Sequence, residues 1–173
     1  MQLRIISTAG VPSFLQQRLP PKLVEIFRPH FNGYLLDSVD DPLLVAYDAR
    51  RRQYRADVIL RHLVKETTGG VTLVITDLDV YIPNLNFVFG LCSGRAALVS
   101  IRRLDPAFYG MPPDRDVLWG RTLKEAVHEI GHAFGLSHCP DPGCVMSFSN
   151  SILDVDKKSP NFCGRCRDKL FTS

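Results

Sequence analysis

The sequence has no long hydrophobic run, no strong excess of either charge, and a single tryptophan. Its apolar runs, such as Val71–Ile75, are far shorter than the roughly 18 residues that a membrane-spanning helix needs. Lysine and arginine number 21 against 18 aspartates and glutamates, and this net charge of +3 is too small to favour nucleic acid or a membrane as a partner. Because the first residues lack the apolar core and cleavage site of a secretory signal, we expect a cytoplasmic protein.

The composition is that of an ordinary globular protein, with 45% hydrophobic and 23% charged residues. A length of 173 residues suits one folded domain over residues 1–173, which we expect to be monomeric. Neither an internal repeat nor a low-complexity segment interrupts the chain.

The most specific feature is the run from His128 to His138, which reads His-Glu-x-x-His-x-x-Gly-x-x-His. His128 and His132 are four residues apart, so on a helix their rings lie about 40° apart around the axis and can bind one ion. Gly135 can adopt a left-handed backbone at little cost, which ends the helix and brings His138 to the same ion. Residues of these types rarely share these offsets by chance, so the run predicts a metal site.

Three imidazoles form an open site for zinc, which prefers four tetrahedral ligands and leaves its fourth position to water. Zinc lowers the pKa of that water to about 7, which makes it a nucleophile at neutral pH. Glu129 follows the first histidine and is expected to point into the same cleft, where it can accept a proton and pass it to a leaving amine. The motif therefore predicts a zinc-dependent hydrolase with Glu129 as its catalytic base.

The residues around the motif fit a helix that begins at Thr122. Thr122 and Glu125 have the spacing of a capping box, in which both side chains bind free amides of the first turn. Apolar residues at helical spacing then form a stripe that anchors the helix on a core. They are Leu123, Ala126, Val127, Ile130 and Phe134.

Of the five cysteines, four lie in the last fifth of the chain, whereas Cys92 stands alone and is expected to be a small buried residue. Cys139 and Cys144, with four residues between them, and Cys163 and Cys166, with two, have the spacing of a four-thiolate structural zinc site. The same residues could form two disulfides in an exported protein, or Cys163 and Cys166 alone could be a redox pair. The zinc site is our preferred interpretation, and it predicts two Zn²⁺ ions per chain.

The two predicted metal sites are adjacent in sequence, because Cys139 directly follows His138. A structural zinc would then fix the loop that carries His138, in a C-terminal segment too short to be held by core packing alone. The basic residues between Lys157 and Lys169 are expected to offset the negative charge of the thiolates.

The segments before the motif alternate between strand and helix, which favours a mostly parallel sheet with helical crossovers. Val71–Thr76 is continuous and rich in β-branched residues, as in a buried central strand. Asn86–Leu91 and Ala96–Ile101 could form a hairpin at the sheet margin. The other predicted elements are a strand over Leu3–Ser7, a helix over Ser13–Arg28 interrupted early by Pro20-Pro21, a strand over Leu43–Tyr47 and a helix over Tyr54–Glu66.

If Asn86–Leu91 is the sheet edge above the zinc, its free backbone groups could pair with an extended peptide. Phe87, Val88, Phe89 and Gly90 are therefore candidate substrate contacts. Burial in the core is nevertheless the commoner fate of phenylalanine.

The run from His128 to His138, followed by Met146, resembles the metzincin metallopeptidases. The additional cluster of Cys139, Cys144, Cys163 and Cys166 makes the chain similar to the archaemetzincins in particular. The resemblance is specific over His128–Cys166.

This resemblance implies an α/β (α+β) fold in which a mixed, twisted sheet with an antiparallel edge strand lies over the zinc helix. Residues 1–135 would form the upper part, and residues 136–173 a small lower part with the third histidine and the four-cysteine zinc site. The resemblance further implies a peptide substrate and a Met-turn, with Met146 beneath the three zinc-binding histidines.

One residue departs from the metzincin pattern. Some metzincins have a tyrosine two residues after the Met-turn methionine, close to the developing oxyanion, but Phe148 occupies that position here. Backbone amides of the edge strand or the hydroxyls of Ser147 and Ser149 are the candidates to assist zinc. The family suggests short peptides as substrates and leaves aminopeptidase and endopeptidase activity both open.

Two other functions fit part of the same pattern. A four-cysteine site beside a basic tail is common among non-catalytic binding modules for protein or nucleic acid. A zinc hydrolase that acts on a non-peptide amide would need the same three histidines and glutamate. The leading prediction is a zinc-dependent peptidase.

Overall fold

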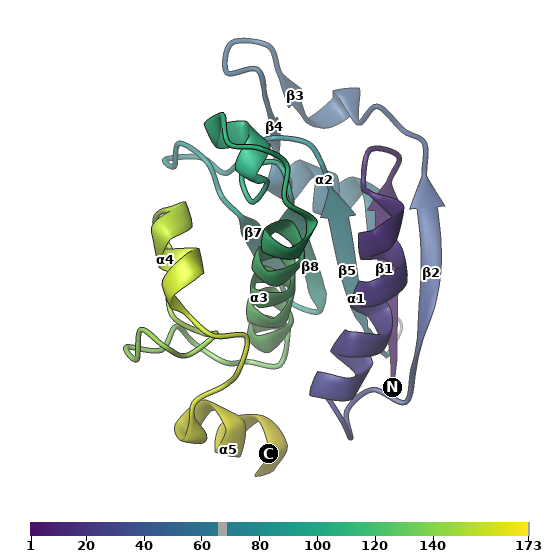
Figure 1. Cartoon of the computed structure of the whole chain (residues 1–173). Helices are drawn as coiled ribbons and strands as arrows, with labels where there is room; N and C mark the ends of the chain where they lie inside the picture. The colour runs from purple at the N-terminus through teal and green to yellow at the C-terminus, as the bar shows by residue number, and fades with distance from the viewer. Residues whose placement is uncertain (66–68, 173) are drawn as a thin grey trace.

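The structure, a computed structural model, describes residues 1–65 and 69–172. In these residues the larger sheet has the strand order β2-β1-β5-β8-β7 (Figure 1). Neighbouring strands from β2 to β8 are parallel, and β7 at the edge is antiparallel to β8. The prediction of a mixed sheet with an antiparallel edge strand is thus confirmed. The bounds are Gln2–Thr8 for β1, Gly33–Val39 for β2, Val71–Thr76 for β5, Gly90–Ser93 for β7 and Ala96–Ser100 for β8.

Helices cover both faces of this sheet. α1 (Ser13–Ile26) and α3 (Arg115–Ala133) pack on one face, and α2 (Ala56–Leu63) packs on the other (Figure 1). Successive residues of a strand point to opposite faces, so Leu73 joins the core under α1 and α3 while Val74 joins the core under α2. Burial on both faces explains why β5 is continuously apolar in sequence.

The remaining elements are short. A second sheet has the order β3-β4-β6, with β3 at Tyr47–Asp48, β4 at Gln53–Arg55 and β6 at Val80–Tyr81. The others are the 3₁₀ helices η1 (Leu44–Ala46) and η2 (Pro106–Tyr109), and the helices α4 (Ile152–Lys157) and α5 (Gly164–Thr172). No helix within the described ranges is both long and apolar enough to cross a membrane.

The predicted strand over Leu43–Tyr47 is wrong, and the second parallel strand is β2 instead. The Asp41 carboxylate accepts a hydrogen bond from the Leu43 backbone at 2.7 Å, and Leu43 has a left-handed backbone with φ +53°. This turn starts η1 where the apolar residues suggested a strand. The sequence of β2 does not alternate between apolar and polar residues, because β2 is an edge strand whose residues are almost all exposed.

Two helices differ from their predicted bounds. α1 continues through Pro20 and Pro21 to Ile26, because one face with Leu15, Leu19 and Leu23 is buried and its packing outweighs the missing backbone hydrogen bonds. α2 spans Ala56–Leu63, and Tyr54 lies in β4. The predicted end of that helix at Glu66 lies outside the described residues.

The helix that carries the histidine motif begins at Arg115, so the predicted start at Thr122 is wrong. Asp114 caps this helix, since its carboxylate accepts hydrogen bonds from the Asp116 and Val117 amides at 2.9 and 3.0 Å. Thr122 instead lies two turns inside α3, fully buried, and its hydroxyl has no hydrogen-bond partner among the described residues.

Candidate active site

The helix α3 ends where the glycine of the motif predicts. Gly135 has a left-handed backbone with φ +87°. Its amide donates to the His132 carbonyl at 2.8 Å, and the Leu136 amide donates to the Gly131 carbonyl at 3.0 Å. These two bonds form a Schellman cap, which reverses the chain and returns His138 toward the helix.

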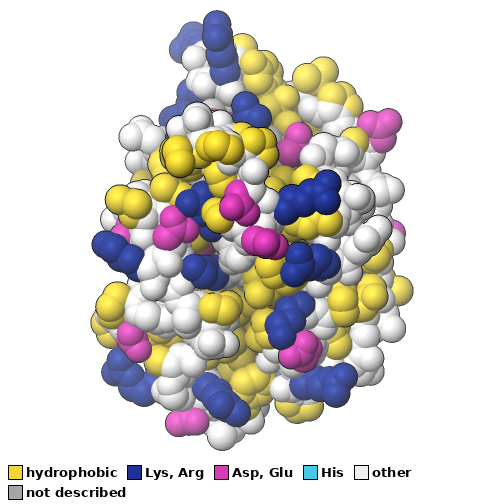
Figure 2. Space-filling model, viewed as in Figure 1, with side chains coloured by type: hydrophobic (Ala, Val, Ile, Leu, Met, Phe, Trp, Pro, Cys, Tyr) yellow, Lys and Arg dark blue, Asp and Glu magenta, His cyan; other side chains and the backbone are white. Residues whose placement is uncertain are grey.

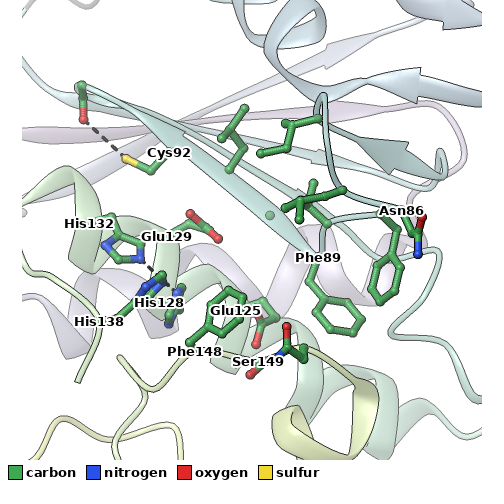
Figure 3. Close-up of a pocket in the computed structure, with 18 residues that line it drawn as sticks. Asn86, Phe89, Cys92, Glu125, His128, Glu129, His132, His138, Phe148 and Ser149 are labelled. Atoms are coloured by element: carbon green, nitrogen blue, oxygen red, sulfur yellow. Dashed lines mark hydrogen bonds between the residues drawn. The ribbon is translucent and has the colours of Figure 1, made fainter. Parts of the chain in front are cut away.

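His128, His132 and His138 converge at the base of a cleft (Figure 3). One ring nitrogen of each lies within 4.8 Å of the other two. The Nδ1 atom of His128 donates to the Val145 carbonyl at 2.8 Å, and that of His132 donates to the Leu136 carbonyl at 2.7 Å. Because a carbonyl only accepts, these bonds place the proton of each neutral ring on Nδ1 and leave Nε2 with a free lone pair.

The two Nε2 atoms of His128 and His132 are 3.0 Å apart. Two lone pairs at this distance repel each other unless a cation lies between them. Tetrahedral zinc with Zn–N distances of about 2.0–2.1 Å separates its nitrogen ligands by about 3.3 Å. The three histidines therefore fit a zinc ion.

The surroundings of these rings favour the form that binds metal. Burial lowers the pKa of His128 from its usual value to about 3, and burial also lowers the pKa of His138. Both rings are thus neutral at physiological pH, and the neutral imidazole is the form that ligates a metal.

Glu129 lies between α3 and the edge strand β7. It is only 5% exposed, and a Cβ atom added to Gly90 would lie 2.5 Å from its Oε1 atom. Burial raises the pKa of Glu129 well above its usual value; the nearby Glu125 also raises it, and Lys158 acts in the opposite sense. A raised pKa suits a carboxylate that must both accept and return a proton.

A cleft of about 700 Å³ runs between α3 and β7 (Figure 3). All four predicted substrate-contact residues, Phe87, Val88, Phe89 and Gly90, line it. Only Gly90 belongs to β7, because the strand is Gly90–Ser93 and not Asn86–Leu91. The Val88 amide instead donates to the Val80 carbonyl of β6 at 3.0 Å, so the preceding segment pairs with the smaller sheet.

Three other residues line the cleft, and one of them, Cys92, differs from its expected position. Cys92, expected to be buried, is half-buried and lines the cleft, where burial and the Glu129 charge raise its pKa to about 12. Phe148 is 53% exposed, and its ring centroid lies 5.0 Å from that of His138. Ser149 lines the cleft with a buried hydroxyl that has no hydrogen-bond partner within the described part of the chain.

The four clustered cysteines also come together. The sulfur atoms of Cys139, Cys144, Cys163 and Cys166 all lie within 4.8 Å of one another. Cys139 and Cys163 are 3.7 Å apart, whereas a disulfide requires about 2.05 Å. Tetrahedral zinc with Zn–S distances of about 2.3 Å separates its sulfur ligands by about 3.8 Å. The arrangement fits a four-thiolate zinc site.

One short segment links the two clusters. The Cys139 amide donates to the Met146 carbonyl at 2.9 Å, and the neighbouring Val145 carbonyl holds His128. Met146 is fully buried, and a Cβ atom added to Gly131 would lie 2.5 Å from its sulfur. The segment therefore packs directly against the helix that carries the first two histidines.

The sequence did not reveal a buried ion pair beside the cleft. The Nζ atom of Lys158 lies 2.8 Å from Oε1 of Glu125, and the two side chains are 1% and 4% exposed. Lys158 was expected to offset the thiolate charge, and Glu125 was expected to cap a helix. Since 33 positions separate them in sequence, no local pattern could pair them.

A buried carboxylate beside three converging histidines, in a cleft bordered by an antiparallel strand, defines a metal-dependent hydrolase. The profile of Peptidase family M54 matches residues 15–172. The chain therefore belongs to this family, the archaemetzincins, and is a zinc metallopeptidase.

Individual relatives agree with this assignment. Archaemetzincin from Methanocaldococcus jannaschii is 49% identical over 138 residues, which cover 79% of this chain and 75% of that protein. The crystal structure of archaemetzincin from Methanopyrus kandleri has a TM-score of 0.82 and 39% identity, and covers 98% of this chain and 93% of its own. The structure of a zinc-dependent peptidase from Methanocorpusculum labreanum has a TM-score of 0.83 and 31% identity, with 97% and 99% coverage.

Proposed function

We propose that the protein hydrolyses short peptides in the cleft between α3 and β7, with Glu129 as general base and acid. His128, His132 and His138 would hold the catalytic zinc. The observation that carries this proposal is the approach of two unprotonated Nε2 atoms to 3.0 Å, one residue away from a buried carboxylate.

The ion, when bound, supplies Lewis acidity that makes a water molecule reactive and polarises the scissile carbonyl. Glu129 accepts a proton from the attacking water and donates it to the departing amine. Its position against Gly90 keeps this carboxylate beside the peptide, and its burial keeps bulk water away from the transferred proton.

The edge strand is suited to hold the substrate. β7 pairs with β8 along one side and borders the cleft along the other, so its outer backbone groups can bind an extended peptide. We assign this peptide an antiparallel orientation, because antiparallel pairing is slightly more stable per residue. Ser149, whose unpartnered hydroxyl lines the cleft, is better placed than Ser147 to assist the oxyanion.

The four cysteines would hold a second, structural zinc ion. This ion would fix the chain on both sides of Met146, and so would brace the lower part over residues 136–173 against the upper part over residues 1–135. Met146 would act as the apolar floor beneath the catalytic histidines. Reduced thiolates are required, which agrees with a cytoplasmic location.

A non-catalytic module for nucleic acid is less well supported. On the face shown in Figure 2, Lys and Arg side chains lie among acidic and hydrophobic ones and not in one continuous patch. Nucleic-acid interfaces instead gather positive charge on one surface. The cleft also has apolar walls suited to a peptide, and a monomer holds the complete site.

Glu129→Ala tests the proposed reaction. The variant should retain two zinc ions per chain by elemental analysis, yet cleave a mixed peptide library at least about 100-fold more slowly by mass spectrometry. Chelation of the wild-type protein should abolish the same cleavage. Unchanged cleavage by Glu129→Ala, or loss of zinc from it, would contradict the assigned role.

A further inference from the structure

Glu125 is a buried carboxylate that lines the cleft and has no part in the proposed reaction. It lies on α3 one turn before His128 and Glu129, and it is 3% exposed. Its Oε1 atom is wholly buried against Lys158, and no donor in the described residues makes a well-aligned hydrogen bond to it. The carboxylate can therefore meet a ligand only through its other oxygen.

The position of Glu125 along the cleft indicates which part of a substrate it meets. Figure 3 shows Cys92 beside His132 at one end of the cleft, and Glu125 with Phe148, Ser149 and Phe89 toward the other. β7 runs from Gly90 to Ser93, away from Phe89. A peptide antiparallel to β7 thus has its carboxyl end at the Phe89 end, so the residue after the scissile bond comes to Glu125.

The walls at this end favour a long side chain with an apolar stem. The rings of Phe87 and Phe89 are 5.1 Å apart and line the cleft together with Phe148. Lysine and arginine bury their methylene groups against such surfaces while their charged ends seek an acceptor. None of the described residues that line the cleft is a lysine or arginine, so no cation of the protein occupies the cleft itself.

Lys158 explains how the carboxylate is held in place. It lies behind Glu125, contacts the Ser147 carbonyl at 3.4 Å, and is itself almost completely buried. Its ion pair with Oε1 fixes the orientation of the carboxylate on the side away from the ligand.

We propose that Glu125, oriented by Lys158, selects peptides with lysine or arginine directly after the scissile bond. This proposal rests on the peptidase function above. It makes Glu125 a specificity residue for the leaving-group side of the substrate, and Lys158 a positioning residue.

Matched peptides test the charge requirement directly. Two pairs of peptides are compared: norleucine keeps the four-carbon stem of lysine without its ammonium group, and citrulline keeps the shape of arginine without its charge. The ratio of kcat/KM for lysine over norleucine should be about tenfold or more in the wild type, as expected for a charge-assisted hydrogen bond. It should fall to near one in Glu125→Gln and remain at the wild-type value in Glu25→Gln, which alters an exposed glutamate on α1.

Glu125→Gln leaves the buried Lys158 without its partner, so folding must be checked by circular dichroism and zinc content. The double variant Glu125→Gln with Lys158→Met removes both charges, and it should also lose the preference for lysine. Retention of the preference in a folded variant would overturn the proposal.

A binding experiment distinguishes failure of the Glu125 proposal from failure of the peptidase function. Fluorescently labelled lysine and norleucine peptides are titrated into zinc-loaded Glu129→Gln protein, where tighter binding of the lysine peptide by about tenfold is expected. Equal cleavage or equal binding of the two peptides would overturn the role of Glu125, while cleavage itself would leave the peptidase function standing. Preferred binding of lysine without any cleavage by the wild type would support Glu125 and count against the peptidase function alone.

Discussion

Gly90 of the edge strand lies against Glu129, the proposed general base, and Gly90→Ala perturbs this contact. The new Cβ atom would lie 2.5 Å from Oε1 of Glu129, 2.7 Å from its Cγ atom and 2.7 Å from the Leu98 carbonyl oxygen. Leu98 belongs to β8, which is paired on both sides, so its backbone resists movement. Ordinary contact begins at 3.4 Å, and the Glu129 oxygen must therefore move by roughly 0.9 Å.

The size of the effect follows from this displacement. A catalytic group misplaced by about 1 Å costs on the order of 100-fold in rate, and overpacking of a buried contact costs about 1–3 kcal/mol of stability. We expect Gly90→Ala to lower kcat/KM about 100-fold and the free energy of unfolding by about 1–3 kcal/mol. Zinc content should not change, because the atoms nearest the added methyl belong to Glu129 and Leu98 and not to a histidine.

Kinetics on the peptide library, urea unfolding and elemental analysis measure the three quantities together. Gly120→Ala on the same helix as Glu129 is the matched control, since no described residue beyond its chain neighbours and its own helix backbone lies within 4 Å of the added Cβ. It should keep full activity and stabilise the protein by up to about 1 kcal/mol. Wild-type activity in Gly90→Ala would refute the position assigned to Glu129, and a loss of zinc would show that the effect arises elsewhere.

Two further predictions concern the metal ligands. Cys144→Ser should lower zinc from two ions to one per chain and the free energy of unfolding by at least about 3 kcal/mol, whereas Cys92→Ser, outside the cluster, should change neither. In chelator-treated protein, burial lowers the pKa of folded His128 from 6.5 to about 3, so the unfolded state binds the proton first as pH falls. His128 alone should lower stability by about 2 kcal/mol from pH 7 to pH 5, measured in urea titrations as the difference between wild type and His128→Gln. His62→Gln should keep the wild-type pH dependence; an unchanged pH dependence in His128→Gln would disprove the assignment.

The parts of the site that sequence predicts are those whose geometry is set locally. The offsets from His128 to His138 are defined by one helical face and one glycine turn, and the structure brings the three histidines together as expected. The cysteines required a longer inference, but their two pairs are each local and lie on either side of a segment that contains α4. In both cases the spacing of ligands along the chain carries most of the geometric information.

Elements set by distant contacts were mispredicted or missed. β2 is a strand because its residues pair with β1 from Gln2 to Thr8, although its exposed side chains show no alternation. The cap at Asp114 was missed because Thr122 and Glu125 offered a competing pattern later in the same helix. Once the helix starts earlier, both of these residues face inward, and burial replaces capping as their role.

The same distinction separates the chemistry of this protein from its selectivity. The proposed zinc ligands and the proposed general base come from one segment of eleven residues, from His128 to His138, so they can be carried between related proteins as a unit. The walls of the cleft come instead from β7 and Phe148, and Lys158 lies behind Glu125 outside the cleft; all of them meet α3 only through the tertiary fold. A substitution at Lys158 can therefore change which peptides fit without touching a zinc ligand. For this reason the matched lysine and norleucine peptides probe a property that the histidine motif does not determine.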